Sequence, residues 1–171
     1  DHPAWIDFAR AMGPMMAPVA ERVAALVSVP SDRDSRVLDV SASHGAYGIA
    51  FAKAHPRTRL VALDWEEVLA ITEQNAEAAG LTDRFSKIVG DAFTVNLGQD
   101  YDVVLIPNFL HHFNAAECVR FLRRVHEAMR PGGQVVIVEF VPHEDRVSPA
   151  GAAAFSLVML GTTPEGDAHT F

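Results

Sequence analysis

The chain has 171 residues, 49% of them hydrophobic, so we expect one ordered domain with a substantial core. The formal net charge of -8 argues against nucleic acid and anionic membranes as partners. A single cysteine excludes an internal disulfide and fits a reducing compartment, and no signal peptide or transmembrane-length apolar run is visible, so we expect a cytoplasmic protein. Because the chain lacks an initial Met and stops in mid-pattern, we expect a fragment of a longer protein.

Residues 1–30 are predicted to form a helical segment that packs on a core of residues 31–171. Pro14 suits the first turn of a helix within residues 4–28. An apolar stripe follows at helical spacing: Met15, Met16, Val19, Val23, Leu26 and Val27.

Beyond residue 35, predicted strands alternate with predicted helices. The strands are residues 36–40, 59–64, 85–89, 101–106 and 134–141, and the helices are residues 46–54, 66–79, 114–130 and 150–160. The strand at 134–141 is nearly all apolar, as a strand buried on both faces should be. This alternation predicts an α/β fold: a Rossmann-like, open, doubly wound parallel sheet that binds its ligand at the carboxyl ends of the strands.

Two acids at strand ends indicate which nucleotide is bound. Asp39 ends the first strand, where a pyrophosphate would gain nothing from a negative charge. Asp64 ends the second strand, where a carboxylate can accept hydrogen bonds from both ribose hydroxyls; the alternative role is an N-cap. Between them, Ser41, Ser43 and Gly45 form a loop of small residues that allows close approach, although a plain turn would look the same. A ligand with a ribose and a cationic amino-acid tail, such as S-adenosylmethionine, suits this pair.

The adenine would lie between two further segments. Trp65 follows the ribose acid, and Asp91, Ala92 and Phe93 follow the third strand. Asp91 can accept from the adenine amino group and Phe93 can pack on its ring, whereas the alternative is a turn with a core phenylalanine. Asn108 ends the fourth strand at the same edge of the sheet.

The pair His111 and His112 comes just after the fourth strand. A histidine titrates near neutrality, so it can take a proton from a hydroxyl, and because adjacent side chains diverge we expect at most one of the two to face the cleft. The alternative is a structural histidine bonded to the backbone. Glu139 could orient the imidazole or be a satisfied strand-end acid. Further ligands at useful spacing are lacking, so no metal site is predicted.

The order of these motifs resembles class I S-adenosylmethionine-dependent methyltransferases: VLDV, HGAYG, the LD of the second strand, GDAF and MRPGGQVVIVE. The flanks FARAM, IPNFLHHFNAAECVRFL and LVMLGTTPEGDAHTF resemble the small-molecule O-methyltransferases of the plant caffeate and bacterial polyketide type. The resemblance implies sheet order 3-2-1-4-5, S-adenosylmethionine as cofactor with S-adenosylhomocysteine as product, and a homodimer for the full-length protein.

The resemblance also assigns residues to the acceptor side of the site. It implies that His111 is the general base, that Glu139 flanks it, and that Met12, Phe113 and Met159 contact the acceptor. From their own positions Met16 and His112 are further candidate acceptor contacts, although methionines could instead fill gaps in the core. Two departures stand out. Ser41 and Ser43 replace loop glycines, and Ala168, beside Asp167, falls near the place of a second flanking acid.

We therefore expect methyl transfer to a hydroxyl of a small aromatic or polyketide-like molecule. A carbon or nitrogen acceptor and a non-catalytic cofactor-binding domain are the alternatives that the sequence leaves open. A nicotinamide dehydrogenase is weaker, since SASHGAYG lacks the G-x-G-x-x-G pattern.

Overall fold

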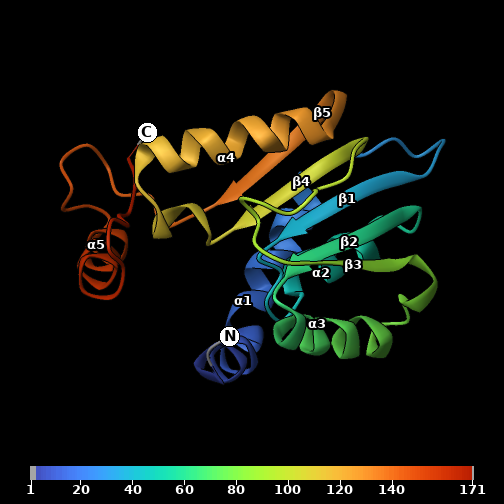
Figure 1. The fold of residues 1–171 in the computed structure, drawn as a ribbon, viewed down its shortest axis with the longest axis horizontal. Helices are drawn as coiled ribbons and strands as arrows, with labels where there is room; N and C mark the ends of the chain where they lie inside the picture. Colours follow the sequence, from blue (N-terminus) through green and yellow to red (C-terminus); the bar gives the residue numbers. More distant parts are fainter. Residues whose placement is uncertain (1–2, 171) are drawn as a thin grey trace.

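The computed structural model describes residues 3–170, which form an open sheet with helices on both faces (Figure 1). Its five parallel strands lie in the order β3-β2-β1-β4-β5, so the predicted fold and strand order are confirmed. The strands are β1 (Ser35–Val40), β2 (Thr58–Asp64), β3 (Phe85–Val89), β4 (Tyr101–Pro107) and β5 (Met129–Val138). The helices are α1 (Pro3–Leu26), α2 (Ala46–Ala54), α3 (Glu66–Ala78), α4 (Ala115–Ala128) and α5 (Ala150–Thr162), with short 3-10 turns η1 (Thr82–Arg84) and η2 (Leu110–His112).

The alternation of side chains along the central strands divides the core into two layers. Leu38 and Val104 point to the face that α4 covers, with Phe121 of that helix. Val37 and Val103 point to the opposite face, which α1 and α2 cover. None of the helices within residues 3–170 combines the length and apolarity that crossing a membrane requires.

Helix α1 differs from its prediction in where it begins and which side it buries. It begins at Pro3, so Pro14 and Pro18 lie inside the helix, and the placement of Pro14 in a first turn is wrong. The apolar stripe is half wrong, because Met15 and Leu26 are exposed while Ala20 and Ala24 are buried. The small side chains of Ala20 and Ala24 let α1 pack closely on α2. The face of α1 that carries these alanines is therefore the buried one.

Strand β5 is an edge strand, and the prediction that it is buried on both faces is wrong. It pairs with β4 alone, and Val135 and Ile137 are 40% and 46% exposed. Asn114 is the N-cap of α4, and its side-chain oxygen accepts from the Glu117 N–H at 2.9 Å. Gly132 and Gly133 fall in the irregular start of β5, before regular pairing with β4 begins at Gln134.

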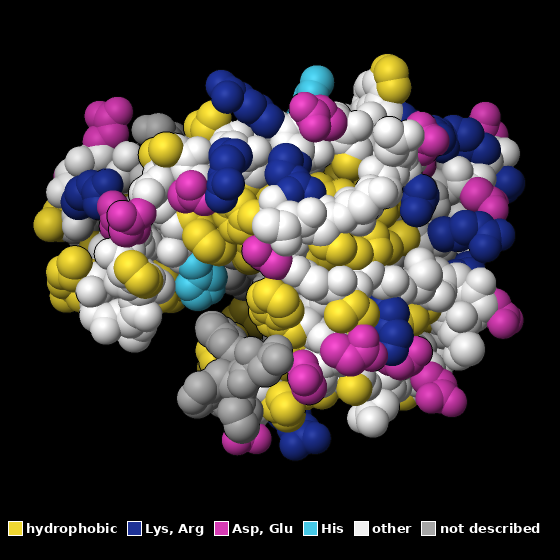
Figure 2. Space-filling view, in the orientation of Figure 1, with side chains coloured by type: hydrophobic (Ala, Val, Ile, Leu, Met, Phe, Trp, Pro, Cys, Tyr) yellow, Lys and Arg dark blue, Asp and Glu magenta, His cyan; other side chains and the backbone are white. Residues whose placement is uncertain are grey.

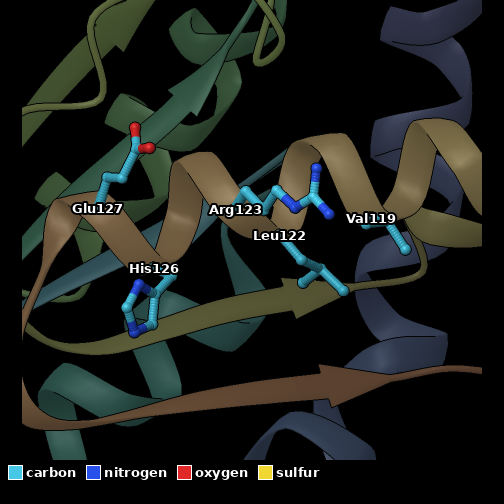
Figure 3. Close-up of a pocket in the computed structure, with 5 residues that line it drawn as sticks. All are labelled: Val119, Leu122, Arg123, His126 and Glu127. Atoms are coloured by element: carbon cyan, nitrogen blue, oxygen red, sulfur yellow. The ribbon is translucent and has the colours of Figure 1, made fainter.

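A hollow beside α4 has five lining residues that all come from that helix: Val119, Leu122, Arg123, His126 and Glu127 (Figure 3). None of them is a predicted site residue. The predicted site lies instead at the carboxyl ends of the strands, where the surface is hollowed between α5 and α1 with a histidine side chain at the margin (Figure 2).

Candidate functional site

Asp39 is a buried carboxylate at the end of β1 with one oxygen unpaired. Its Oδ2 accepts a hydrogen bond from the Gly48 N–H at 2.9 Å, while Oδ1 has no hydrogen-bond partner within the described residues. Burial raises the pKa of Asp39 to about 7, against the lowering effect of the Gly48 bond, and nearby Asp64 raises it further. An unpaired buried acceptor is costly, so this oxygen is suited to a cationic or hydrogen-bonding ligand group.

The loop after β1 is held in left-handed backbone conformations. Ser41, Ser43 and Gly45 have φ of 53°, 54° and 79°. A Cβ on Gly45 would lie 2.8 Å from the Thr72 Cγ2, so only glycine fits there. The Thr72 hydroxyl donates to the Ser43 carbonyl at 2.6 Å, and the Asn75 amide donates to the carbonyl of the next residue at 2.8 Å. Helix α3 thus fixes the loop, and the serines keep the backbone shape that glycines were expected to provide.

Asp64 ends β2 on the same face of the sheet as Asp39 and organises that loop. Its Oδ2 accepts from the Ser43 N–H at 2.9 Å, and its Oδ1 accepts from the Trp65 N–H at 2.8 Å. Burial raises the pKa of Asp64, opposed by these two bonds. Trp65, and not Asp64, is the N-cap of α3, so the alternative role of an N-cap is excluded. The Trp65 side chain is 44% exposed at the edge of the site, which leaves its indole open to a ligand ring.

Asp91, Ala92 and Phe93 follow β3 in a turn. Asp91 lies at the sheet edge and its Oδ1 accepts from the Phe93 N–H at 2.9 Å, and Ala92 is buried. The Phe93 ring packs against three phenylalanines, with centroid distances of 4.7 Å to Phe113, 5.3 Å to Phe121 and 6.1 Å to Phe109. These contacts favour the alternative of a core phenylalanine.

A methionine of α1 reaches the end of β4. The Met16 Sδ lies 3.7 Å from the Asn108 Nδ2 and 3.7 Å from the Tyr47 hydroxyl, both of which can donate to it. Asn108 has φ of 52°, and its N–H donates to the Val138 carbonyl at 2.7 Å. The sequence analysis missed Tyr47, whose signal is a polar aromatic in the first turn after the small-residue loop.

His111 and Glu139 form the most elaborate hydrogen-bonded unit of the site. The His111 Nδ1 lies 2.6 Å from the Glu139 Oε2. The other oxygen of Glu139 accepts from the N–H groups of Phe109, Leu110 and His111, at 3.0, 2.8 and 3.4 Å. Since a carboxylate only accepts, Nδ1 carries the hydrogen, which leaves Nε2 with its lone pair. Glu139 therefore fixes both the turn η2 and the tautomer of its histidine.

The neighbouring histidine does not diverge as predicted. The rings of His111 and His112 lie 4.3 Å apart, so the two side chains share one side of the turn. Burial lowers the pKa of His112 to about 4, helped by the charge of His111 and opposed by that of Glu139. His112 is thus neutral at physiological pH. Phe113, the next residue, joins the aromatic core cluster, 5.0 Å from Phe109.

Helix α5 and the segment after it cover the other side of His111. The Phe155 ring meets the His111 ring edge to face at 4.8 Å, and Met159, one turn later, is buried. The Asp167 N–H donates to the His111 carbonyl at 3.0 Å, while the Asp167 carboxylate pairs with Arg146. Ala168 is buried, so a second acid beside His111 is absent from this position. Sequence reasoning missed Phe155, although it stands four residues before Met159 and so shares its helix face.

The remaining predicted acceptor contact, Met12, lies on α1 one turn before Met16. Within residues 3–170 no group of three or more His, Cys, Asp or Glu side chains could hold a metal ion.

The fold and this edge of the sheet define the class of the protein. The sheet order is that of class I methyltransferases, and the chain superposes with a TM-score of 0.95 on the crystal structure of a Nostoc punctiforme protein assigned as an O-methyltransferase. The sequences are 49% identical, and the match covers 100% of this chain and 51% of the other. Residues 7–170 match the model of the O-methyltransferase domain, so the chain belongs to that family.

Two curated relatives show the range of reactions in the family. The 3-hydroxy-5-methyl-1-naphthoate 3-O-methyltransferase of Streptomyces sahachiroi is 30% identical over 82% of this chain and 40% of its own length. The L-tyrosine C(3)-methyltransferase of Streptomyces lavendulae is 28% identical over 77% of this chain and 36% of its own length. The chain thus spans less than half the length of these relatives.

Proposed function

We propose that this chain is the cofactor-binding and catalytic part of an enzyme that transfers a methyl group from S-adenosylmethionine to a hydroxyl of a small aromatic or polyketide-like molecule. The observation that carries the proposal is the His111–Glu139 pair at the same sheet edge as the two buried acids. A nicotinamide dehydrogenase would gain nothing from an acid such as Asp39 beside its diphosphate.

The residues present fit the cofactor. The unpaired Asp39 Oδ1 would hold its cationic amino-acid tail, together with the N–H groups of the loop after β1. Asp64 would accept from the ribose hydroxyls through its remaining lone pairs, with the Trp65 indole beside the adenine. Asp91 would reach the adenine amino group. When bound, S-adenosylmethionine supplies a methyl group already activated on its sulfonium.

The chemistry that remains for the protein is alignment and proton removal. His111 Nε2 would accept the proton of the acceptor hydroxyl as oxygen attacks, while Glu139 stabilises the imidazolium through Nδ1. Met12, Met16 and Met159 would give the acceptor an apolar and adaptable wall, with His112 and Phe113 beside it. Holding the reactants in line can supply roughly 7–11 kcal/mol of the barrier.

Calorimetric titration with S-adenosylhomocysteine, with NAD alongside, tests the cofactor assignment. We expect micromolar binding of the first and none of the second. Turnover is then measured with labelled S-adenosylmethionine on 3-hydroxy-5-methyl-1-naphthoate and L-tyrosine. Binding of neither nucleotide to the whole protein would overturn the proposal.

Replacement of the base is the first mutational prediction. His111→Ala should lower kcat by about 10²–10⁴-fold, since the proton acceptor is lost, and leave the affinity for S-adenosylhomocysteine nearly unchanged. His126→Ala, at an exposed position in the last turn of α4, is the matched control and should retain wild-type kcat. Retained turnover with lost nucleotide binding would contradict the role of His111.

A carbon acceptor is the second candidate, favoured by the similarity to the L-tyrosine C(3)-methyltransferase. Mass spectrometry of the labelled product separates the two, because an aryl methyl ether and a ring-methylated phenol fragment differently.

A homodimer for the whole protein and a cytoplasmic location remain predictions, and sedimentation of the whole protein tests the first.

A further inference from the structure

Helix α5 touches the catalytic pair through a single aromatic side chain. Phe155 stacks on Phe140, with ring centroids 4.2 Å apart and an interplanar angle of 26°. The same ring meets His111 edge to face, at 4.8 Å and 81°. Phe140 directly follows Glu139 in the chain, so the two rings join α5 to the segment that carries the carboxylate.

The backbone of His111 is held independently of α5. The Glu139 carboxylate accepts from three N–H groups around η2, and the Asp167 N–H caps the His111 carbonyl. One hydrogen bond to Glu139 does not by itself fix the plane of the imidazole, which also lies 4.3 Å from the His112 ring. The edge-to-face contact with Phe155 adds a restraint on that plane from α5.

The orientation of α5 supports this role. Ala152 and Met159 are buried and share a helix face with Phe155, whereas Leu157, Val158 and Leu160 are exposed. The inward face of α5 therefore brings Phe155 to His111, and the other large apolar residues of the helix lie elsewhere.

We propose that Phe155 is a positioning residue for the base: its ring holds the His111 imidazole so that Nδ1 stays on Glu139 and Nε2 faces the acceptor. This inference rests on the proposed function for its catalytic consequence, but the positioning itself is measurable in the protein without ligand. A shift of the ring by about 1 Å can cost about a hundredfold in rate.

Proton NMR of the whole protein tests the positioning. A short bond from Nδ1–H to a carboxylate gives a low-field proton resonance, which His111→Asn should remove and so assign. Phe155→Leu, which removes the ring but keeps an apolar side chain, should broaden or abolish this resonance. Phe155→Tyr, which keeps the ring, should retain it, and so should Leu160→Ala, a control on the exposed face of α5. An unchanged resonance in Phe155→Leu would overturn the inference.

Kinetics separate positioning from simple contact with the acceptor. We expect Phe155→Leu to lower kcat by about ten- to a hundredfold with little change in KM, and Phe155→Tyr to restore it. A raised KM with unchanged kcat would show that Phe155 only lines the acceptor pocket, and would overturn the inference. If the wild-type protein neither binds S-adenosylhomocysteine nor transfers methyl groups, the proposed function fails, while the NMR result still decides whether Phe155 positions the ring.

Discussion

Burial of the ionised Asp39 carboxylate lowers the free energy of unfolding of the protein. In the unfolded chain its carboxyl ionises near pH 3.8, but burial raises the folded pKa to about 7. The folded state therefore holds a proton more tightly, and this group makes stability fall as pH rises from about 4 to about 7. At ~1.4 kcal/mol per pKa unit, the ionised group costs on the order of 4 kcal/mol above pH 7.

The first prediction at this scale follows from that cost. Asp39→Asn should be more stable than the wild type at pH 8 and nearly equally stable at about pH 3.5, because an amide stays neutral and can still accept from Gly48. It should bind S-adenosylhomocysteine about tenfold or more weakly, since a charge-assisted hydrogen bond is lost. Thermal unfolding at both pH values and calorimetry check this. Equal unfolding curves at pH 8 would show that the wild-type carboxyl carries no such penalty.

Ser41 and Ser43, in the loop after β1, have positive φ angles that strain the backbone of a residue other than glycine. A non-glycine residue at positive φ costs about 1 kcal/mol or more, partly offset because glycine makes the unfolded chain more flexible. Ser41→Gly and Ser43→Gly should therefore each be neutral to stabilising, by up to about 1 kcal/mol in urea unfolding. Gly45→Ala is the matched opposite and should destabilise, because its Cβ would meet Thr72 at 2.8 Å. Clear destabilisation by both serine replacements would indicate that the hydroxyl groups, and not the backbone shape, hold the loop.

At the scale of elements, the start of α2 shows packing overriding helix propensity. Alanine favours a helix over glycine by about 1 kcal/mol. A Cβ on Gly48, however, would lie 2.6 Å from the Leu60 Cδ1 and 2.7 Å from the Asp39 Oδ2.

Gly48→Ala should therefore destabilise the protein by about 1–3 kcal/mol, as expected for overpacking, and should disturb the acid of the cofactor site. Gly151→Ala in α5 has nothing within 4 Å of the added Cβ and should be neutral or stabilising. Urea unfolding of both variants checks the pair. If Gly48→Ala were more stable than the wild type, Leu60 of β2 would be able to shift and make room for the added Cβ, and the overpacking argument would be wrong.

At the scale of the whole molecule, Asp102 joins three strands at the end of the sheet away from the site. Its carboxylate accepts from Arg33 at 2.6 Å and from the Arg36 N–H at 2.8 Å, and it pairs with Arg130 at 3.2 Å. Burial alone would raise the pKa of Asp102, but these partners outweigh it and lower the pKa.

A lowered pKa means stability that is present above about pH 4 and lost as pH falls through the folded pKa. Asp102→Asn should thus lose about 2 kcal/mol at pH 7, since the arginines lose their partner. The difference from the wild type should shrink below pH 4 in thermal unfolding. Asp34→Asn, at an exposed ion pair, is the control and should change little. A difference that persists undiminished at low pH would contradict the electrostatic account.

Local patterns predicted much of the fold because strands at the centre of a parallel sheet are apolar and end at one edge. The bounds of α2 and β3 were predicted without error, and Asp39, Asp64 and His111 were placed at that edge from their positions after strands. Edge strands and central strands can have the same apolar sequence pattern, so β5 was predicted to be buried on both faces. Nothing in the spacing of α1 distinguished Ala20 from Val19 as the buried residue.

The sequence by itself determined the alternation of strands and helices, the acids at the strand ends and the histidine after β4, because alternating periodicities and strand-end polar residues are local properties of the chain. The sheet order was implied by the resemblance of its motifs to a known family. Only the tertiary structure decided which chemical state those residues adopt. Burial raises the pKa of Asp39 to about 7 and lowers the pKa of His112 to about 4, and both shifts depend on desolvation by distant segments. Contact across 44 residues of sequence brings Phe155 to His111, and no spacing within either segment carries that information.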